Sequence, residues 1–126
     1  MSLRINKNSQ MDPEVAKRLH AEGATLIVLD VPEGTEFGID YFSWNVGPRF
    51  KGVKMIPPGL HFIYYSAVNR AGQTASRTGL FLYTSRRDIV VLKWSTATED
   101  LVEKATNEEE IDRYRQGILR FCVAYT

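Results

Sequence analysis

The sequence contains very little cysteine, and this limits the compartments that it suits. Cys122 is the single cysteine among the 126 residues, so no disulfide can form within the chain. Small secreted domains usually carry several cysteines, because disulfides supplement a small hydrophobic core. We therefore expect a protein of a reducing, intracellular compartment.

Long apolar runs and an excess of charge of either sign are also missing. No stretch approaches the roughly 20 apolar residues that cross a bilayer, and segment 1–10 is polar, unlike a secretory signal. The 16 basic and 15 acidic side chains nearly balance, so no field of one sign attracts nucleic acid or anionic lipid. The sequence predicts neither membrane attachment nor direct binding of nucleic acid.

Residues that usually carry catalysis or hold metals are few. His20 and His61 lie too far apart for a short metal-ligand spacing, and His61 is predicted to be a hydrogen-bonded packing residue in an apolar strand. Cys122 is predicted to be a small buried apolar residue and not a nucleophile. Segment 34–38 lacks the further glycines and the lysine of a phosphate-binding loop. We expect no catalytic residues, no metal and no cofactor, and hence no enzyme.

Apolar and aromatic residues, by contrast, are plentiful. They make up 44% and 11% of the chain, enough for one contiguous core in a single domain. Strands are predicted where β-branched and aromatic residues concentrate between Gly, Asn, Ser or Asp. The three clearest predicted strands are 60–66, 79–84 and 89–95, and 24–31 is a further predicted strand. Segment 24–31 is apolar on both faces and is predicted to be buried centrally, whereas 84–88 is short enough for a hairpin loop.

Two segments carry helix signals. Asp12 followed by Pro13 suits a helix start, and the helix is predicted to end near Gly23. Asn107 followed by three glutamates is a second start, which predicts an amphipathic helix over 106–126. Its apolar stripe recurs at spacings of three and four and consists of Ile111, Tyr114, Ile118 and Phe121.

These signals together predict a mainly β fold. We expect a β-sandwich-like domain over 11–105 that includes a short N-terminal helix, followed by the C-terminal amphipathic helix over 106–126. Segment 1–10 shows no sustained period, and a second methionine follows it at Met11. We expect that segment to be a leader that is either disordered or artificially added.

A series of short segments between Met11 and Ser95 matches the motifs of one protein family. The matching segments are 11–14, 22–25, 34–40, 43–48, 50–59 and 61–62, with weaker matches at 79–82 and 92–95. On these motifs the chain resembles the N-terminal domain of the a-one cistron splicing factor family. The loop 67–78 and the segment after Thr96 carry no family motif.

The resemblance implies a fold and a set of partners. Proteins of this family carry an N-terminal β-sandwich-like domain and a larger helical C-terminal domain, which places 106–126 at the junction to a helical domain missing here. The family assembles the spliceosomal U-five small nuclear ribonucleoprotein (snRNP). Its members bind the RNase H-like and MPN-like domains of the large central scaffold protein and prevent the helicase of the particle from binding prematurely. The implied locations are nucleus and cytoplasm, and the implied partners are the scaffold and the helical domain.

Candidate contact residues follow from side-chain type alone. Large aromatic side chains and arginine dominate the energetics of protein interfaces. The candidates in the least regular third of the chain and in the long loop are Phe42, Trp44, Phe50, Arg70 and Arg77.

Two other functions stay open at this point. A small RNA-binding module is one, because Arg86 and Arg87 lie beside strands whose tyrosines suit base stacking: Tyr64, Tyr65 and Tyr83. A charged loop tip is the plainer interpretation of the two arginines. A sandwich-fold enzyme acting on a small molecule is the other, and it requires a deep polar pocket with His61 beside a carboxylate.

Overall fold

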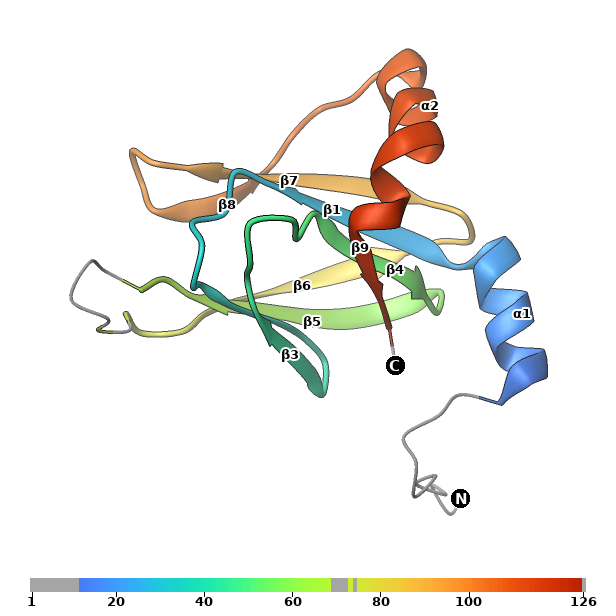
Figure 1. Cartoon of the computed structure of the whole chain (residues 1–126), viewed down its shortest axis with the longest axis horizontal. Coiled ribbons are helices and arrows are strands. Elements are labelled where there is room, and N and C mark those ends of the chain that lie inside the picture. Colours follow the sequence, from blue (N-terminus) through green and yellow to red (C-terminus); the bar gives the residue numbers. More distant parts are fainter. Residues whose placement is uncertain (1–11, 69–72, 74, 126) are drawn as a thin grey trace.

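Two β-sheets pack against each other in the computed structural model, which describes residues 12–68, 73 and 75–125 (Figure 1). The mainly β, sandwich-like fold predicted from the sequence is confirmed. The first sheet has the order β8 (Asp100–Glu103), β7 (Ile89–Ser95), β1 (Ala24–Leu29), β4 (Gly52–Ile56) and β9 (Cys122–Ala124). The second has the order β3 (Phe42–Asn45), β2 (Glu36–Ile39), β5 (Gly59–Ser66) and β6 (Thr78–Thr84). The predicted leader 1–10 lies outside the described residues.

Strand β1 lies in the middle of the first sheet, as its apolar character on both faces predicted. It pairs in parallel with β7 and antiparallel with β4, and β4 in turn pairs in parallel with β9. Leu26 and Ile27 are completely buried although their side chains point to opposite faces. The reason is that both faces of a central strand are covered, so burial selects apolar residues at every position.

The second sheet is antiparallel throughout. A turn of two residues, Asp40 and Tyr41, joins β2 to β3, while the long segment 67–77 joins β5 to β6. Along β5 the side chains of His61, Ile63 and Tyr65 are buried, and the residues between them face outward. Strand β6 forms one edge of this sheet.

The core is shared by the two sheets. Leu26 and Val28 of the first sheet pack in one cluster with Phe37 and Ile63 of the second. A polar link also crosses between the sheets at Tyr65. Its hydroxyl donates to Asp100 Oδ1 at 3.2 Å and accepts from the Leu101 N–H at 3.1 Å. The two sheets are therefore joined by directional bonds as well as by apolar contact.

The N-terminal helix α1 (Pro13–Glu22) forms where the sequence predicts it. Asp12 caps the helix, because its Oδ1 accepts the N–H of Glu14 at 2.8 Å. Gly23 ends the helix at a tight place, since a Cβ there would overlap the Leu19 carbonyl oxygen and the backbone of Met55. None of the helices in the described part of the chain is long and apolar enough to span a membrane.

The C-terminal segment is helical only as far as Phe121. Helix α2 (Glu108–Gly117) begins at Asn107 as predicted, and the Asn107 side chain accepts the N–H of Glu110. A 3-10 turn, η1 (Ile118–Phe121), follows it, and the chain then becomes strand β9. The prediction of helix is therefore wrong for residues 122–125, which lie in β9 and directly after it. Glycine weakens the helix at Gly117, and pairing with β4 offers residues 122–124 a partner that no local pattern shows. That 106–126 forms a junction stays a prediction.

The segment 84–88 is also not the hairpin loop that its length predicted. Strands β6 and β7 belong to different sheets, so this segment carries the chain from one sheet to the other. Its turn is held by Asp88, whose Oδ2 accepts the N–H of Ser85 at 2.7 Å, and by Arg87 in a left-handed conformation (φ 62°). A tight turn alone cannot distinguish a hairpin from a change of sheet.

Candidate functional site

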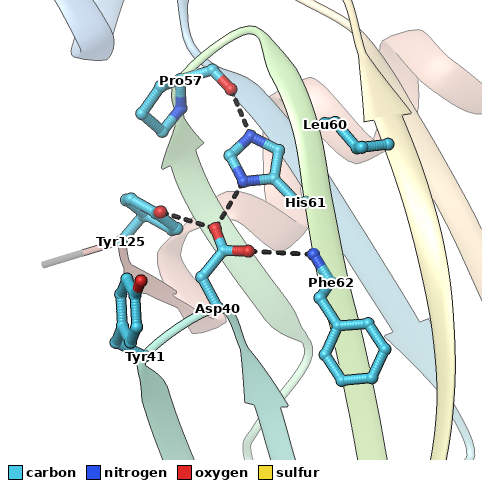
Figure 2. A pocket seen from close by; sticks show the side chains of 7 residues that line it. All are labelled: Asp40, Tyr41, Pro57, Leu60, His61, Phe62 and Tyr125. Carbon is cyan, nitrogen blue, oxygen red and sulfur yellow. Dashed lines mark hydrogen bonds and ion pairs between the residues drawn. The ribbon is translucent and has the colours of Figure 1, made fainter.

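A cluster of polar side chains closes one end of the second sheet (Figure 2). Asp40 lies in the turn after β2 with a left-handed backbone (φ 53°). Its Oδ2 is 2.6 Å from His61 Nδ1 and accepts the hydroxyl of Tyr125 at 2.6 Å. Its Oδ1 accepts the N–H of Phe62 at 2.9 Å. Three distant parts of the chain therefore meet at one carboxylate.

The surroundings favour the ionised form of Asp40. Burial by itself raises the pKa of this carboxyl, but the hydrogen bonds from His61, Tyr125 and the Phe62 N–H outweigh it and hold the pKa below its ordinary value. Burial and the neighbouring carboxylate both raise the pKa of Tyr125, so this hydroxyl keeps its proton and serves as a donor. The cluster is a charged acceptor surrounded by donors.

His61 has both ring nitrogens engaged. Nδ1 faces the Asp40 carboxylate, and Nε2 is 2.6 Å from the carbonyl oxygen of Pro57. Both neighbours accept hydrogen bonds, so both ring nitrogens are occupied by protein partners and neither is open to a substrate. The prediction that His61 is a hydrogen-bonded packing residue is confirmed.

A pocket of about 450 Å³ lies beside this cluster. Its lining residues are Asp40, Tyr41, Pro57, Leu60, His61, Phe62 and Tyr125. The enzyme alternative required His61 beside a carboxylate, and that pair is present. The polar atoms that line the pocket, however, form hydrogen bonds with one another. The outer part of the pocket lining is apolar and exposed at Tyr41 and Leu60. The arrangement suits contact with another surface better than proton transfer.

Metal binding finds no support in the described residues, which contain no group of three or more His, Cys, Asp or Glu side chains that could hold an ion. Cys122 is buried, and its environment raises the pKa of the thiol to about 11, mainly through desolvation. The thiol therefore stays protonated and weakly nucleophilic. Its predicted character as a small buried apolar residue is confirmed.

The three predicted aromatic contacts lie together in a row. The rings of Phe42 and Trp44 on β3 are 6.5 Å apart between centroids, and that of Phe50 is 6.3 Å from Trp44. The row continues to Tyr125, whose ring meets Phe42 edge-on at 4.9 Å. All three predicted residues are half-buried, and Trp44 and Phe50 pack against the core. Their role in binding stays a prediction.

The two predicted arginine contacts have different outcomes. Arg70 lies outside the described residues, so its place is not described. The side chain of Arg77 is well exposed, donates from Nε to Glu36 Oε1 at 2.9 Å, and lies over the ring of Tyr64 at 5.3 Å. Arg77 is thus held in a defined position on the outer side of the second sheet, away from the row formed by Phe42, Trp44 and Phe50.

One exposed apolar face was missed as a protein-contact surface, although two of its residues, Tyr64 and Tyr83, are among the tyrosines considered for RNA stacking. Strands β5 and β6 carry an outer aromatic face, which consists of Leu60, Phe62, Tyr64, Phe81 and Tyr83. Phe81 and Tyr83 are each 70% exposed. The signal was available in the sequence, since alternate residues of two strands that form one hairpin share a face. Tyr65, one of the tyrosines considered for RNA stacking, points instead into the core.

Comparison with known proteins agrees with the motifs. Residues 22–124 match the profile of the AAR2 N-terminal domain. The chain belongs to the AAR2 family. The resemblance to the a-one cistron splicing factors, inferred from the motifs between Met11 and Ser95, is thereby confirmed.

Curated AAR2 relatives give the extent of the likeness. The AAR2 homolog of Homo sapiens is 51% identical over 111 residues, which cover 86% of this chain and 29% of the human protein. The homolog of Caenorhabditis elegans is 37% identical over 108 residues, with the same two shares. The chain thus spans less than a third of the length of the AAR2 relatives that it matches.

Proposed function

We propose that this chain acts in pre-mRNA splicing as an assembly factor of the U-five snRNP. In this proposal it binds the RNase H-like and MPN-like domains of the large central scaffold protein and blocks premature binding of the helicase. It works in the nucleus and the cytoplasm. Membership of the AAR2 family is the observation that carries the proposal.

The geometry supports a role in binding and not in catalysis. The Asp40–His61 pair is saturated by its own partners, and the buried thiol of Cys122 stays protonated. A sandwich of two sheets with buried polar links is a rigid body, which can present a preformed surface at little entropic cost. We propose that the chain changes no covalent bond and acts by occupying its partner.

A second proposed partner is the helical domain that follows in the family. The end of β9 lies beside the cluster formed by Asp40, His61 and Tyr125, because Tyr125 contributes to that cluster directly. A domain attached after Tyr125 would therefore start next to the exposed Tyr41. That position suits an intramolecular contact at this end of the second sheet.

Binding to the purified RNase H-like and MPN-like domains of the scaffold tests the main proposal. We expect capture of the chain at micromolar concentrations, and we expect Arg77→Glu to weaken it by about tenfold, as reversal of an interface charge does. Arg18→Glu on the exposed side of α1 is the matched control and should bind like the parent. Absence of binding at these concentrations by both scaffold domains and by the helical domain would contradict the proposed role.

RNA binding is the second candidate, and one observation favours it. The outer aromatic face combines exposed rings with Arg77 over Tyr64, a combination that stacks unpaired bases. The net charge of +1 argues against it, because affinity for nucleic acid depends mainly on neutralised phosphates. Binding of a single-stranded RNA that weakens steeply with added salt would support this alternative.

A further inference from the structure

Strand β6 forms an edge of the second sheet that no other described strand covers. It pairs with β5 on one side, and within the described part of the chain no strand pairs with its other side. Its seven residues, Thr78–Thr84, include no charged residue and no proline. Proteins usually protect such an edge with lysine, proline, a bulge or a covering loop, because free backbone groups invite another strand.

The hydrogen bonds of β5 show which of its residues turn their backbone N–H and C=O groups toward β2 and which turn them toward β6. The Phe62 carbonyl accepts the N–H of Asp40 at 2.8 Å, and the Phe62 N–H donates to the Asp40 side chain. Asp40 directly follows β2, so the backbone of Phe62 faces β2. Successive residues of a strand alternate in this respect. The backbone groups of His61 and Ile63 therefore face β6.

The same alternation fixes the orientation of β6. Leu82 and Leu80 are the register partners of His61 and Ile63, so their N–H and C=O groups bond to β5. The residues between them, Phe81 and Tyr83, turn their N–H and C=O groups to the open side. Gly79 does the same. The edge thus offers three evenly spaced donor and acceptor pairs to an added strand.

Side chains on the outer aromatic face provide further contacts for an added strand. Phe81 and Tyr83 lie opposite Phe62 and Leu60 in the β5–β6 register, and the rings of Phe62 and Phe81 are 5.3 Å apart. The Phe62 ring also covers Gly79, where a Cβ would overlap it. An added strand would therefore place alternate side chains against Phe81 and Tyr83, which rewards apolar residues at those positions.

Basic side chains mark both ends of the edge. Arg77 precedes β6 and is 66% exposed, whereas its partner Glu36 is 30% exposed. Arg86 follows β6 and is also 66% exposed, against 40% for its partner Glu22. Each ion pair thus turns its guanidinium outward. Two copies paired antiparallel along β6 would bring Arg77 of one beside Arg86 of the other, which disfavours a dimer.

We propose that the open edge of β6 is a docking site for an extended segment of a partner protein, which joins the second sheet as a fifth strand. The segment is uncharged and alternately apolar opposite Gly79, Phe81 and Tyr83, and acidic at both ends. Backbone bonding supplies the affinity, and the side chains with the flanking charges supply the selectivity. The inference rests on the proposed function only for the identity of the partner.

Two synthetic peptides test the site. Both have the middle sequence Thr-Val-Thr-Val-Thr-Val-Thr, flanked by two aspartates at each end in one and by two lysines in the other. We expect the acidic peptide to bind about tenfold more tightly than the basic one. Amide hydrogen exchange by NMR should slow at Gly79, Phe81 and Tyr83 when it binds, and should stay unchanged at Leu80 and Leu82.

Substitutions at the edge sharpen the test. Phe81→Pro removes an outward N–H without breaking the bonds between β5 and β6, so the variant should fold and lose the peptide. Leu82→Pro breaks an inner bond and should unfold the chain. Tyr83→Lys adds a charge to the edge and serves as a second variant if Phe81→Pro does not fold. Val102→Thr replaces an exposed apolar side chain on β8, in the other sheet, and should bind the peptide like the parent.

Several results would overturn the proposal. They are absence of binding up to about 1 mM peptide, slowed exchange at the leucines as much as at the aromatic residues, and equal affinity for the two peptides. Competition by a uridine oligonucleotide would reassign the face to RNA. Self-association that Phe81→Pro abolishes would assign the edge to a second copy. Because the assay uses peptides, it can fail while the scaffold is captured, or succeed while it is not.

Discussion

Asp40 is the residue on which one end of the second sheet depends. Three donors from β5 and from the chain after β9 converge on its side chain, and its left-handed backbone closes the turn between β2 and β3. Aspartate tolerates that conformation better than most residues do. The same side chain therefore serves the turn and the charge cluster.

Replacement of the Asp40 carboxylate should lower the free energy of unfolding and should change how that free energy depends on pH in acid. Asp40→Asn leaves the buried His61 without its anion, so we expect the free energy of unfolding at pH 7 to fall by about 2–4 kcal/mol. Because the folded pKa of Asp40 lies below the unfolded value of about 3.9, the parent gains stability above that value. It loses this contribution as pH falls through the folded pKa.

Urea unfolding followed by tryptophan fluorescence between pH 7 and pH 3 measures both effects. The difference between the parent and Asp40→Asn should shrink as the solution becomes more acidic. Asp30→Asn is the matched control, because Asp30 is exposed, also has a left-handed backbone, and meets Lys93 only at 3.8 Å. It should change stability by less than about 0.5 kcal/mol. A pH-independent difference for Asp40→Asn would show that its charge has no role.

Cys122 provides a second test at this scale. With its pKa raised to about 11 and its side chain buried in β9, the thiol should react with iodoacetamide at pH 8 about 100-fold more slowly in the folded protein than in urea. Mass spectrometry of quenched samples measures the rate. Fast labelling of the folded chain would mean that β9 separates readily from β4.

Among the elements, strands were easier to predict than their neighbours. The segments that became β1, β5, β6 and β7 could be recognised because β-branched and aromatic residues mark a strand locally. The pairing of these strands could not be recognised, since the parallel partners Thr25 of β1 and Ile89 of β7 are 64 positions apart in the sequence. The helix prediction failed at 122–124 for the same reason, because the pairing partner β4 is remote in sequence.

The contacts of the polar cluster could not be predicted from the sequence for a similar reason. His61 was predicted to be hydrogen-bonded, yet its partner Asp40 lies 21 positions away, and Tyr125 lies 85 positions from Asp40. No local pattern connects them. The candidates Phe42, Trp44 and Phe50 were chosen by side-chain type, and they do gather in space. Side-chain type could not reveal that they are half-buried.

The pairing of β1 with β4 depends on a glycine. Gly52 has φ 146°, and a Cβ there would overlap the carbonyl oxygen of Leu26. Gly52→Ala should therefore lower the free energy of unfolding by more than about 3 kcal/mol. Gly117→Ala is the contrasting control, since nothing lies near its Cβ position, and it should raise stability by up to about 1 kcal/mol. Urea unfolding monitored by circular dichroism compares them, and equal effects would contradict the close approach at Gly52.

At the scale of the whole molecule, the two sheets should unfold together. They share one core, and Tyr65 bonds to Asp100 and Leu101 across them. The chain has two tryptophans, and each reports on a different sheet: Trp44 on the second, Trp94 on the first.

Single-tryptophan variants make this prediction measurable. Trp94→Phe leaves Trp44 as the reporter, and Trp44→Phe leaves Trp94. Within each variant, the urea midpoint from fluorescence should agree with the midpoint from circular dichroism, as two-state unfolding requires. Tyr65→Phe added to each variant should lower both midpoints. A fluorescence midpoint that departs from circular dichroism in either variant would show that the sheets unfold separately.

The parallel pairing of β4 with β9 also has a consequence for synthesis on the ribosome. Strand β4 leaves the exit tunnel long before residues 122–124 do. The edge of β4 that pairs with β9 therefore has no partner strand while the intervening chain is translated. Pairings between distant segments form late and slowly. The nascent chain therefore passes through a stage with bare strand edges, when chaperone protection matters most.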